Sequence, residues 1–305
     1  MTLGEYGKMK VLVIGGTGSV GSEVVAGIRR SGAAVRCMSR YPKKLESLPQ
    51  GVEGCVGDLE KPATLNAAFA GVHAVFLTTA LSRNETLQGL AAVSAAKRAR
   101  VAKLVSLSVP MPPGSAHIPH YRSKIPIERA IQESDLNYTI LRPNNFFQND
   151  YLWCRAAVMC YGVYPQPIGS VGLNRVDIRD VAEAAVHALL RPGHDGKDYP
   201  LHGADVLTGE SVAAIFSRHL GREIHYGGND LEAWAKQAQH MMPEWMVKDL
   251  RIMYDYFQSH GLLAAPQDFT EQYKLLGRDP RRFDDFVAEI VPIWKREMAS
   301  DPTVH

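Results

Sequence analysis

The hydrophobic positions in the first half of the chain follow two alternating patterns. Short apolar runs rich in β-branched residues predict buried strands, and segments with helical spacing lie between them. The expected strands are 9–14, 34–38, 52–56, 73–78, 103–107 and 138–141. The expected helices are 20–30, 62–70, 84–100 and one that ends near Ser134. This alternation predicts an α/β fold with right-handed crossovers and a doubly wound, parallel Rossmann sheet.

The pattern loosens in the second half. Residues 161–172 are rich in glycine and proline and are expected to form a loop, while 176–178 and 199–202 are expected as short strands. Residues 180–190 predict an amphipathic helix that Asp180 caps. The chain is mostly helical from Glu210 onward. We therefore expect a Rossmann domain over 1–155, to which 174–192 returns, and a smaller, mostly helical substrate lobe over 156–305.

Composition narrows the class of protein. Of the 305 residues, 46% are hydrophobic and 22% are charged, as in ordinary soluble enzymes, and the net charge of +2 requires neither nucleic acid nor membrane as a partner. The four cysteines form no CxxC pair and no zinc-type spacing, so we expect no metal and a reducing compartment. No apolar run reaches the ~20 residues of a membrane span, and the N-terminal residues lack the pattern of a signal peptide. A cytoplasmic location is expected.

A glycine-rich segment, GGTGSVG, joins the first strand to the first helix. Glycine there allows a tight turn, a close approach of pyrophosphate to the backbone, and close packing of helix and strand. The helix N-terminus then presents N–H groups to phosphate. A glycine turn that binds no ligand is the alternative. A P-loop of the NTPase type is excluded, because Ser22 stands where that loop needs a lysine. The residues expected to contact the cofactor are Gly15, Thr17, Gly18, Ser19, Val20 and Gly21.

The end of the second strand indicates NADP(H) rather than NAD(H). An NAD site carries an acid about 20 residues past the glycines, but no acid occurs between Ala33 and Leu45. Arg40 can instead clamp a 2′-phosphate, with Ser39 and Lys43 or Lys44 beside it. A solvated basic turn is the alternative.

Polar residues also follow the third and fourth strands. Asp58, next to Leu59, could bond the adenine amine or cap the following turn, and the sequence leaves both alternatives open. Thr78 and Thr79 end the fourth strand, where a Rossmann sheet places its ligand. We expect all four residues to line the cofactor.

With these residues placed, the chain resembles the NmrA-like branch of the short-chain dehydrogenase/reductase superfamily. The resemblance rests on VIGGTGSVG, the SR after the second strand, VGDLEKPATL, GVHAVFLTT, KLVSLS, HYRSK, YTILRPNNFFQN, VDIRDVAEAA and LLGRDPRRFDDF, in the family's order. It implies an NADP-binding Rossmann fold with a small C-terminal lobe. The activity it implies is broad, because the family contains reductases of quinones, dyes and enones as well as non-catalytic redox sensors.

The catalytic residues depart from the Ser and Tyr-x-x-x-Lys of the better-known dehydrogenases. Ser108, rather than Ser106, stands where the serine is expected, and Lys124 where the lysine is. His120 occupies the place of the tyrosine, and Tyr121 is one residue out of register, which turns it about 100° away on a helix. Lys124 would bond the nicotinamide ribose, and His120 can supply a proton near neutral pH.

Two features leave that assignment open. His120 could instead be a surface residue at the helix start, after Pro119 in the first turn. Pro126 cannot donate an N–H, so it either kinks this helix or begins it. If the helix began at Pro126, His120 and Lys124 would lie on a loop and share no helical face.

The segment after the sixth strand should flank the nicotinamide. Pro143, Asn144 and Phe146 are expected to contact the cofactor, and Phe147 the substrate. Core packing of at least one phenylalanine is the alternative. Tyr164, in the following loop, is expected in the wall of the substrate pocket.

We therefore expect an NADPH-dependent reductase of a small organic acceptor such as a quinone, enone, imine or carbonyl compound. A homodimer is compatible with the sequence. Two alternatives remain at this stage. The protein could be a non-catalytic NADP(H) sensor, which the missing tyrosine favours, or an isomerase or lyase that retains its cofactor.

Overall fold

The computed structural model describes residues 9–300 and divides the chain into two compact units. The first unit holds the chain up to Pro143 together with Ile178–Leu201 and Thr270–Arg278. The second holds Asn144–Asp177, His202–Phe269 and the chain from Asp279. The first continuous stretch thus ends at Pro143 rather than near residue 155, because the backbone leaves the sheet where its sixth strand ends. No helix within residues 9–300 combines the length and apolar character needed to cross a bilayer.

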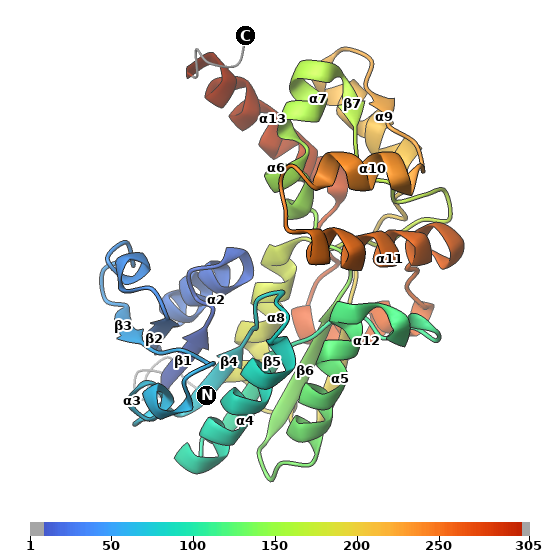
Figure 1. Cartoon of the computed structure of the whole chain (residues 1–305). Helices are drawn as coiled ribbons and strands as arrows, with labels where there is room; N and C mark the ends of the chain where they lie inside the picture. Colours follow the sequence, from blue (N-terminus) through green and yellow to red (C-terminus); the bar gives the residue numbers. More distant parts are fainter. Residues whose placement is uncertain (1–8, 301–305) are drawn as a thin grey trace. The chain divides into compact units, whose positions relative to one another are not determined.

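The first unit is built on a parallel sheet of seven strands in the order β3-β2-β1-β4-β5-β6-β8 (Figure 1). The strands are β1 (Lys10–Ile14), β2 (Ala34–Ser39), β3 (Glu53–Val56), β4 (Ala74–Leu77), β5 (Lys103–Leu107), β6 (Tyr138–Pro143) and β8 (Lys197–Leu201). The strand order reverses between β1 and β4, which is the switch point where doubly wound sheets bind ligands. The predicted Rossmann fold is confirmed.

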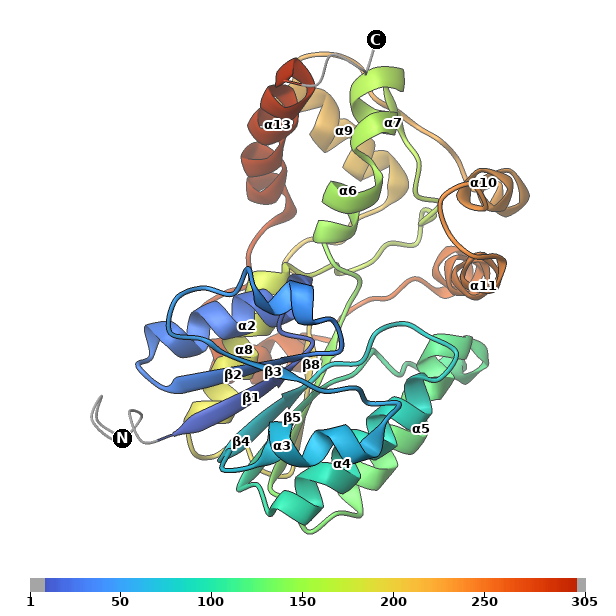
Figure 2. The same cartoon turned by 60° about the vertical axis from the view of Figure 1, so that its left-hand side comes forward.

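Helices cover both faces of this sheet. Figure 2 shows α2 and α8 on one face and α3, α4 and α5 on the other. Their bounds are α2 (Ser19–Arg30), α3 (Leu65–Phe69), α4 (Glu85–Ala99), α5 (Pro119–Gln132), α8 (Ile178–Leu190) and α12 (Pro266–Leu276), with 3₁₀ turns η1 (Pro42–Leu45), η2 (Pro62–Thr64) and η3 (Ser115–His117). A sheet covered on both faces explains why β1 and β4 are continuous apolar runs rather than alternating ones.

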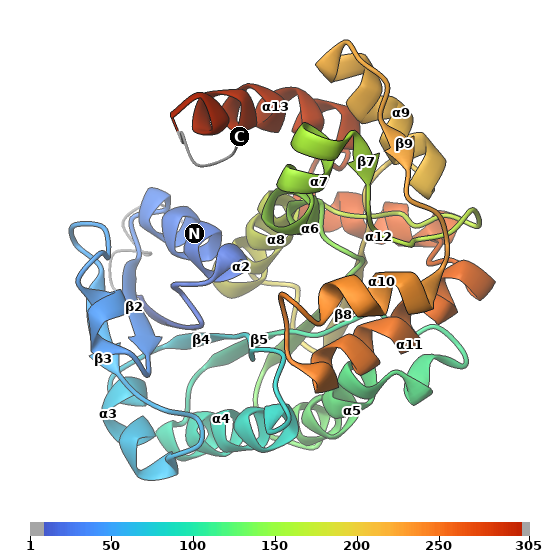
Figure 3. The same ribbon diagram turned by 45° about the horizontal axis from the view of Figure 1, so that its top comes forward.

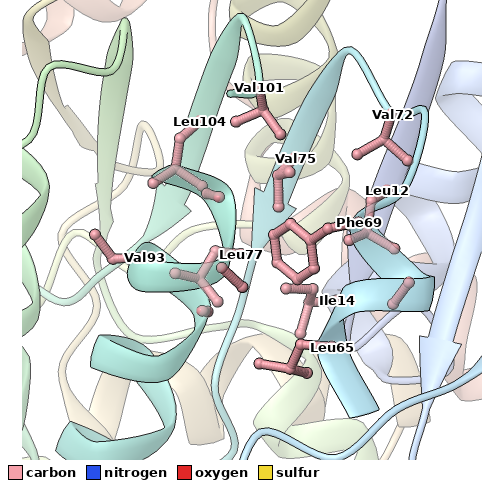
Figure 4. Close-up of a cluster of buried hydrophobic side chains, with 14 of the residues drawn as sticks. Leu12, Ile14, Leu65, Phe69, Val72, Val75, Leu77, Val93, Val101 and Leu104 are labelled. Atoms are coloured by element: carbon pink, nitrogen blue, oxygen red, sulfur yellow. The ribbon is translucent and has the colours of Figure 1, made fainter. Parts of the chain in front are cut away.

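One buried hydrophobic cluster of the first unit lies between the sheet and the layer of α3, α4 and α5. Leu12 and Leu77 from the strands meet Leu65, Phe69 and Val93 from the helices in one buried cluster (Figure 4). Each fully buried side chain of this size contributes about 1.5–3 kcal/mol. This cluster therefore holds the strand ends, and the loops that follow them, in a fixed arrangement.

The second unit is mainly helical. Its elements are α6 (Gln148–Trp153), α7 (Arg155–Tyr161), β7 (Val163–Tyr164), α9 (Gly209–Leu220), β9 (His225–Tyr226), α10 (Leu231–Ala238), α11 (Glu244–His260) and α13 (Phe283–Ser300). β7 pairs with β9 in parallel, and α10 lies beside α11 (Figure 3). The predicted loop over 161–172 therefore contains a short strand and begins at the last residue of α7.

Two local predictions were wrong. Residues 176–178 form no strand, since Val176 makes only an isolated bridge with Phe146 and Ile178 begins α8. Asp180 does not cap that helix, because it lies inside the first turn. Its buried carboxylate instead accepts a hydrogen bond of 2.6 Å from Arg278.

Candidate functional site

The predicted site residues of the first unit gather at one edge of its sheet. In a parallel sheet every strand ends at the same edge, so the residues that follow β1, β2, β3, β4 and β5 are neighbours there. Those residues are the glycine loop, Ser39 and Arg40, Asp58 and Leu59, Thr78 and Thr79, and Ser108. The structure thus brings together five segments that the sequence separates.

The glycine loop has steric limits at Gly15 and Gly21 and open space at Gly18. Gly15 has a φ of +76°, which favours glycine, and a Cβ there would lie 2.5 Å from the Thr78 Cγ2. A Cβ on Gly21 would lie 2.1 Å from the carbonyl oxygen of Gly15, so α2 packs against the loop only because Gly21 has no side chain. A Cβ on Gly18 would meet only that same oxygen, at 3.3 Å. Gly18 therefore leaves space above the loop.

A buried cysteine lies beneath this loop. A Cβ on Gly16 would come within 2.6 Å of the Cys37 Sγ, which shows how closely β2 supports the turn. Burial raises the pKa of the Cys37 thiol to about 11, so the thiol is protonated at neutral pH. Cys37 therefore acts as a packing residue.

The turn after β2 carries the predicted basic residues. Arg40 and Lys44 are exposed, and both lie over the ring of Tyr41, with the Arg40 Cζ 4.9 Å and the Lys44 Nζ 5.6 Å from the ring centroid. The hydroxyl of Ser39 accepts a hydrogen bond of 3.1 Å from the Tyr41 N–H, which fixes the turn. The two cations thus share one aromatic platform, a contact that the sequence analysis did not anticipate.

Asp58 follows β3 and is half-buried. Its Oδ1 accepts a hydrogen bond of 3.0 Å from the Glu60 N–H, and its own N–H donates to the Thr64 hydroxyl at 2.9 Å. Asp58 therefore stabilises the turn that leads into η2, which was one of the two roles expected for it. Contact of Asp58 or of its half-buried neighbour Leu59 with adenine stays a prediction.

Lys124 lies on α5, which begins at Pro119 and continues through Pro126. The condition that would have placed His120 and Lys124 on a loop is therefore not met, and both residues belong to adjacent turns of one helix. His120 is half-buried, whereas Tyr121 is buried. The one-residue offset thus places the tyrosine in the interior.

The Lys124 side chain is buried and bound to two polar side chains. Its Nζ forms an ion pair of 2.8 Å with the Glu85 Oε1 and donates to the Thr79 hydroxyl at 2.7 Å. The residue is only 7% exposed and Glu85 only 3%. Glu85 was not predicted as a site residue, because an acid in the first turn of a helix is ordinarily explained by its favourable interaction with the helix dipole.

Ser108 also has a buried partner. Its hydroxyl donates to the Oε1 of Glu128, and Arg142 holds the same carboxylate through contacts of 3.1 and 2.6 Å. The single hydroxyl proton of Ser108 is used in this bond, while its oxygen can still accept one. Ser106, the alternative serine, lies within β5 and is buried.

The segment after β6 belongs to the second unit, and two of its residues that were expected to contact cofactor or substrate are buried. Phe147 is fully buried, with its ring centroid 5.0 Å from that of Phe283. The Asn144 amide donates to the Leu262 carbonyl at 2.8 Å and is buried. The assignment of Phe147 to substrate binding is therefore corrected to core packing. Phe146 is half-buried and Pro143 ends β6; their contacts with cofactor stay predictions.

Tyr164 is likewise corrected. It is fully buried, and its hydroxyl is 3.3 Å from the Asp150 Oδ1 and 3.2 Å from the Arg175 Nη1. Asp150 and Arg175 form a completely buried ion pair, with two contacts of 2.9 Å. Tyr164 thus satisfies a buried charge pair inside the second unit and does not form the wall of a pocket.

Known proteins can now be compared with this arrangement. Residues 7–287 match the NmrA-like family. The chain belongs to the NmrA-like family. The family assignment made from the sequence motifs is confirmed.

The named proteins that are similar to this chain include enzymes and a regulator. The chain is 33% identical to an NAD(P)H azoreductase from Xenophilus azovorans, over 90% of this chain and 96% of that protein. Its fold is similar to that of an NADPH-dependent quinone oxidoreductase from Escherichia coli solved with NADPH (TM-score 0.81, 23% identity, 92% of this chain and 99% of that one). It is also similar to NmrA, a negative transcriptional regulator solved with NADP (TM-score 0.76, 20% identity, 97% and 98%). The azoreductase, at 33% identity over nearly its whole length, supports the predicted NAD(P)H-dependent oxidoreductase.

Proposed function

We propose that this protein is an NADPH-dependent reductase that transfers hydride to a small organic acceptor. The observation that carries the proposal is the placement of the glycine loop, the Arg40 turn and Lys124 at one edge of the sheet. These are the three elements that a Rossmann reductase needs for pyrophosphate, 2′-phosphate and nicotinamide ribose. The named azoreductase and quinone oxidoreductase support an electron-poor acceptor of the azo or quinone type.

The residues present fit the phosphates of the cofactor. Helix α2 begins after Gly18 with no side-chain cap and no acidic residue in its first turn. Its positive end is therefore turned toward the space that Gly18 leaves open, and no carboxylate of that turn repels an anion there. Thr17, Ser19 and Val20 would complete the backbone around the pyrophosphate.

The residues after β2 would select NADP(H) over NAD(H). The guanidinium of Arg40 can bond a 2′-phosphate through two N–H groups, and Lys44 adds a second positive charge beside the Tyr41 ring. No carboxylate occurs between Ala33 and Leu45 to repel that phosphate. Charge at this turn thus favours the phosphorylated cofactor.

Two residues of α5 and one residue after β4 would act near the nicotinamide. Lys124 would hold the nicotinamide ribose, Thr79 would steady the ammonium, and His120 would deliver the proton that accompanies reduction. When bound, NADPH supplies the hydride. An azo, quinone or imine acceptor takes up one hydride and one proton, so a proton donor is needed in each turnover.

The remaining assignments extend this proposal. We place the protein in the cytoplasm, acting on a small molecule without nucleic acid or membrane as a partner, as a monomer or homodimer. We also assign the first unit to the cofactor, and to the second a contribution to binding the acceptor. The acceptor class is the part that experiment must define.

The test is the nicotinamide absorbance of purified protein mixed with NADPH or NADH and with separate quinones, azo dyes, enones and imines. We expect NADPH to be consumed faster than NADH with at least one acceptor class. His120→Ala should lower kcat by about 10²-fold, the lower end of the range for a lost general acid. Binding of NADPH without consumption by any acceptor would instead favour a sensor such as NmrA or a cofactor-retaining isomerase.

A further inference from the structure

A buried carboxylate stands at the centre of the reacting end of the site. Glu85 lies in the first turn of α4, and its carboxylate is within hydrogen-bond distance of three side chains. Its Oε1 is 2.8 Å from the Lys124 Nζ and 2.8 Å from the Thr79 hydroxyl, and its Oε2 is 2.6 Å from the Ser123 hydroxyl. These donors come from the end of β4 and from α5, so Glu85 links three elements of the first unit.

The contacts with Glu85 and Thr79 orient the ammonium of Lys124. An ammonium has three N–H groups. One is directed to Glu85 and one to the Thr79 hydroxyl at 2.7 Å. The third is left with the Leu107 carbonyl at 3.5 Å, which is long for a hydrogen bond. Two short anchors therefore fix the direction of the group, while the third N–H is loosely held and can be given to a ligand hydroxyl.

We propose that Glu85 is the positioning residue for Lys124, fixing its ammonium at the ends of β4 and β5 so that one N–H is presented to the nicotinamide ribose. This inference rests on the proposed function, because that function gives Lys124 its task. Glu85 acts through Lys124 and touches neither cofactor nor acceptor. A buried ammonium needs a nearby anion to offset its loss of hydration, and Glu85 supplies it.

A double-mutant cycle on NADPH affinity tests this role. Glu85→Gln keeps the shape of the side chain and removes its charge, and Lys124→Met removes the ammonium. We expect Glu85→Gln to raise the Kd for NADPH about tenfold in the natural protein and to change it little when Lys124→Met is already present. Turnover should show the same coupling in kcat/KM.

Thr86→Val is the matched control. The Thr86 hydroxyl donates to the Ser123 carbonyl at 2.8 Å, so it joins the same two helices without touching Lys124. We expect this variant to lower the melting temperature and to leave NADPH affinity unchanged. If Lys124→Met does not fold, Glu85→Gln compared with Thr86→Val decides the matter.

The outcomes separate the two proposals. Tighter or unchanged NADPH binding by Glu85→Gln, or the same loss with and without Lys124, would overturn the positioning role. If the natural protein binds NADPH but reduces no acceptor, the reductase proposal fails, while the coupling in Kd still tests whether Glu85 acts through Lys124. The affinity for NADPH is thus the primary measurement, and turnover is the second.

Discussion

The hydroxyl of Ser108 donates its proton to Glu128, the residue one helical turn beyond Lys124 on α5. Arg142 holds the same carboxylate and also lies 2.8 Å from Asp198. Ser108 stands where the better-known dehydrogenases carry a serine. Here the serine joins a charged network that ties β5 and α5 to the strands beyond them.

Replacing Ser108 with alanine should therefore affect stability more than catalysis. Loss of a buried hydrogen bond to a charged acceptor is expected to lower the free energy of unfolding by about 1.5–3 kcal/mol. Denaturant unfolding measures this loss, and steady-state kinetics with NADPH should show kcat nearly unchanged. Ser106→Ala, which replaces a buried serine within β5, is the control. A large fall in kcat at unchanged stability would show that Ser108 contacts the reacting atoms.

Two glycine substitutions should separate folding from cofactor binding. A Cβ on Gly21 would overlap the Gly15 carbonyl at 2.1 Å, so Gly21→Ala should lower the melting temperature. Gly18 has a φ of −91°, which other residues adopt, and space above it. We expect Gly18→Ala to fold normally and to lose NADPH affinity, because its methyl group enters the space assigned to the pyrophosphate.

Calorimetry and NADPH titration of both variants provide the comparison. Equal affinity of Gly18→Ala and the natural protein for NADPH would place the phosphates elsewhere. A thermally normal Gly21→Ala would contradict the steric account of the loop.

Arg40→Ala should weaken NADPH binding by about 10–100-fold, as expected for the loss of hydrogen bonds to a charged group, and should leave NADH binding nearly unchanged. Arg129→Ala, which removes an exposed arginine paired with Glu133, is the control for a simple change in net charge. The measurement is a fluorescence titration with each cofactor. Equal losses for NADPH and NADH would contradict the assignment of Arg40 to the 2′-phosphate.

Acid should destabilise the second unit through His202. Burial lowers the pKa of His202 below its ordinary value of 6.5, although Asp268 opposes the shift. Its Nδ1 accepts a hydrogen bond of 3.2 Å from the Asn144 amide, which protonation would break. The unfolded chain therefore binds the proton more tightly than the fold does. The stability that His202 contributes is present above about pH 6.5 and is lost as pH falls through the lowered pKa.

Unfolding in denaturant at a series of pH values from about 7.5 to about 5 checks this sign. His202→Gln should lose less stability on acidification than the natural protein. His225→Gln, at an exposed position, is the control and should follow the natural protein. An equally steep decline in His202→Gln would assign the acid sensitivity to other groups.

The fold and the family could be predicted because their signals are local. Strands β1 and β4 are short apolar runs, and the GGTGSVG segment marks the turn between the first strand and the first helix by sequence alone. The helix over Pro119–Gln132 was uncertain only because of Pro126, which α5 contains within its length.

The site was harder to predict because its partners are distant in sequence. Glu85 has the appearance of an ordinary first-turn acid until α5 brings Lys124 against it. Phe147 is adjacent to residues expected near the nicotinamide, but Phe283, far along the chain, packs over its ring. Tyr164 in a glycine- and proline-rich segment suggested an open loop. The buried pair of Asp150 and Arg175, on separate segments, determines its actual role.

The most direct test of the central claim follows NADPH and one acceptor, a quinone or an azo dye, in the same cuvette. The account predicts that the natural protein consumes one NADPH for each two-electron reduction of the acceptor, prefers NADPH to NADH, and is impaired by Lys124→Met. Tight binding of NADPH with no loss of its absorbance across the acceptor panel would contradict the account, because a reductase must oxidise its cofactor in every turnover.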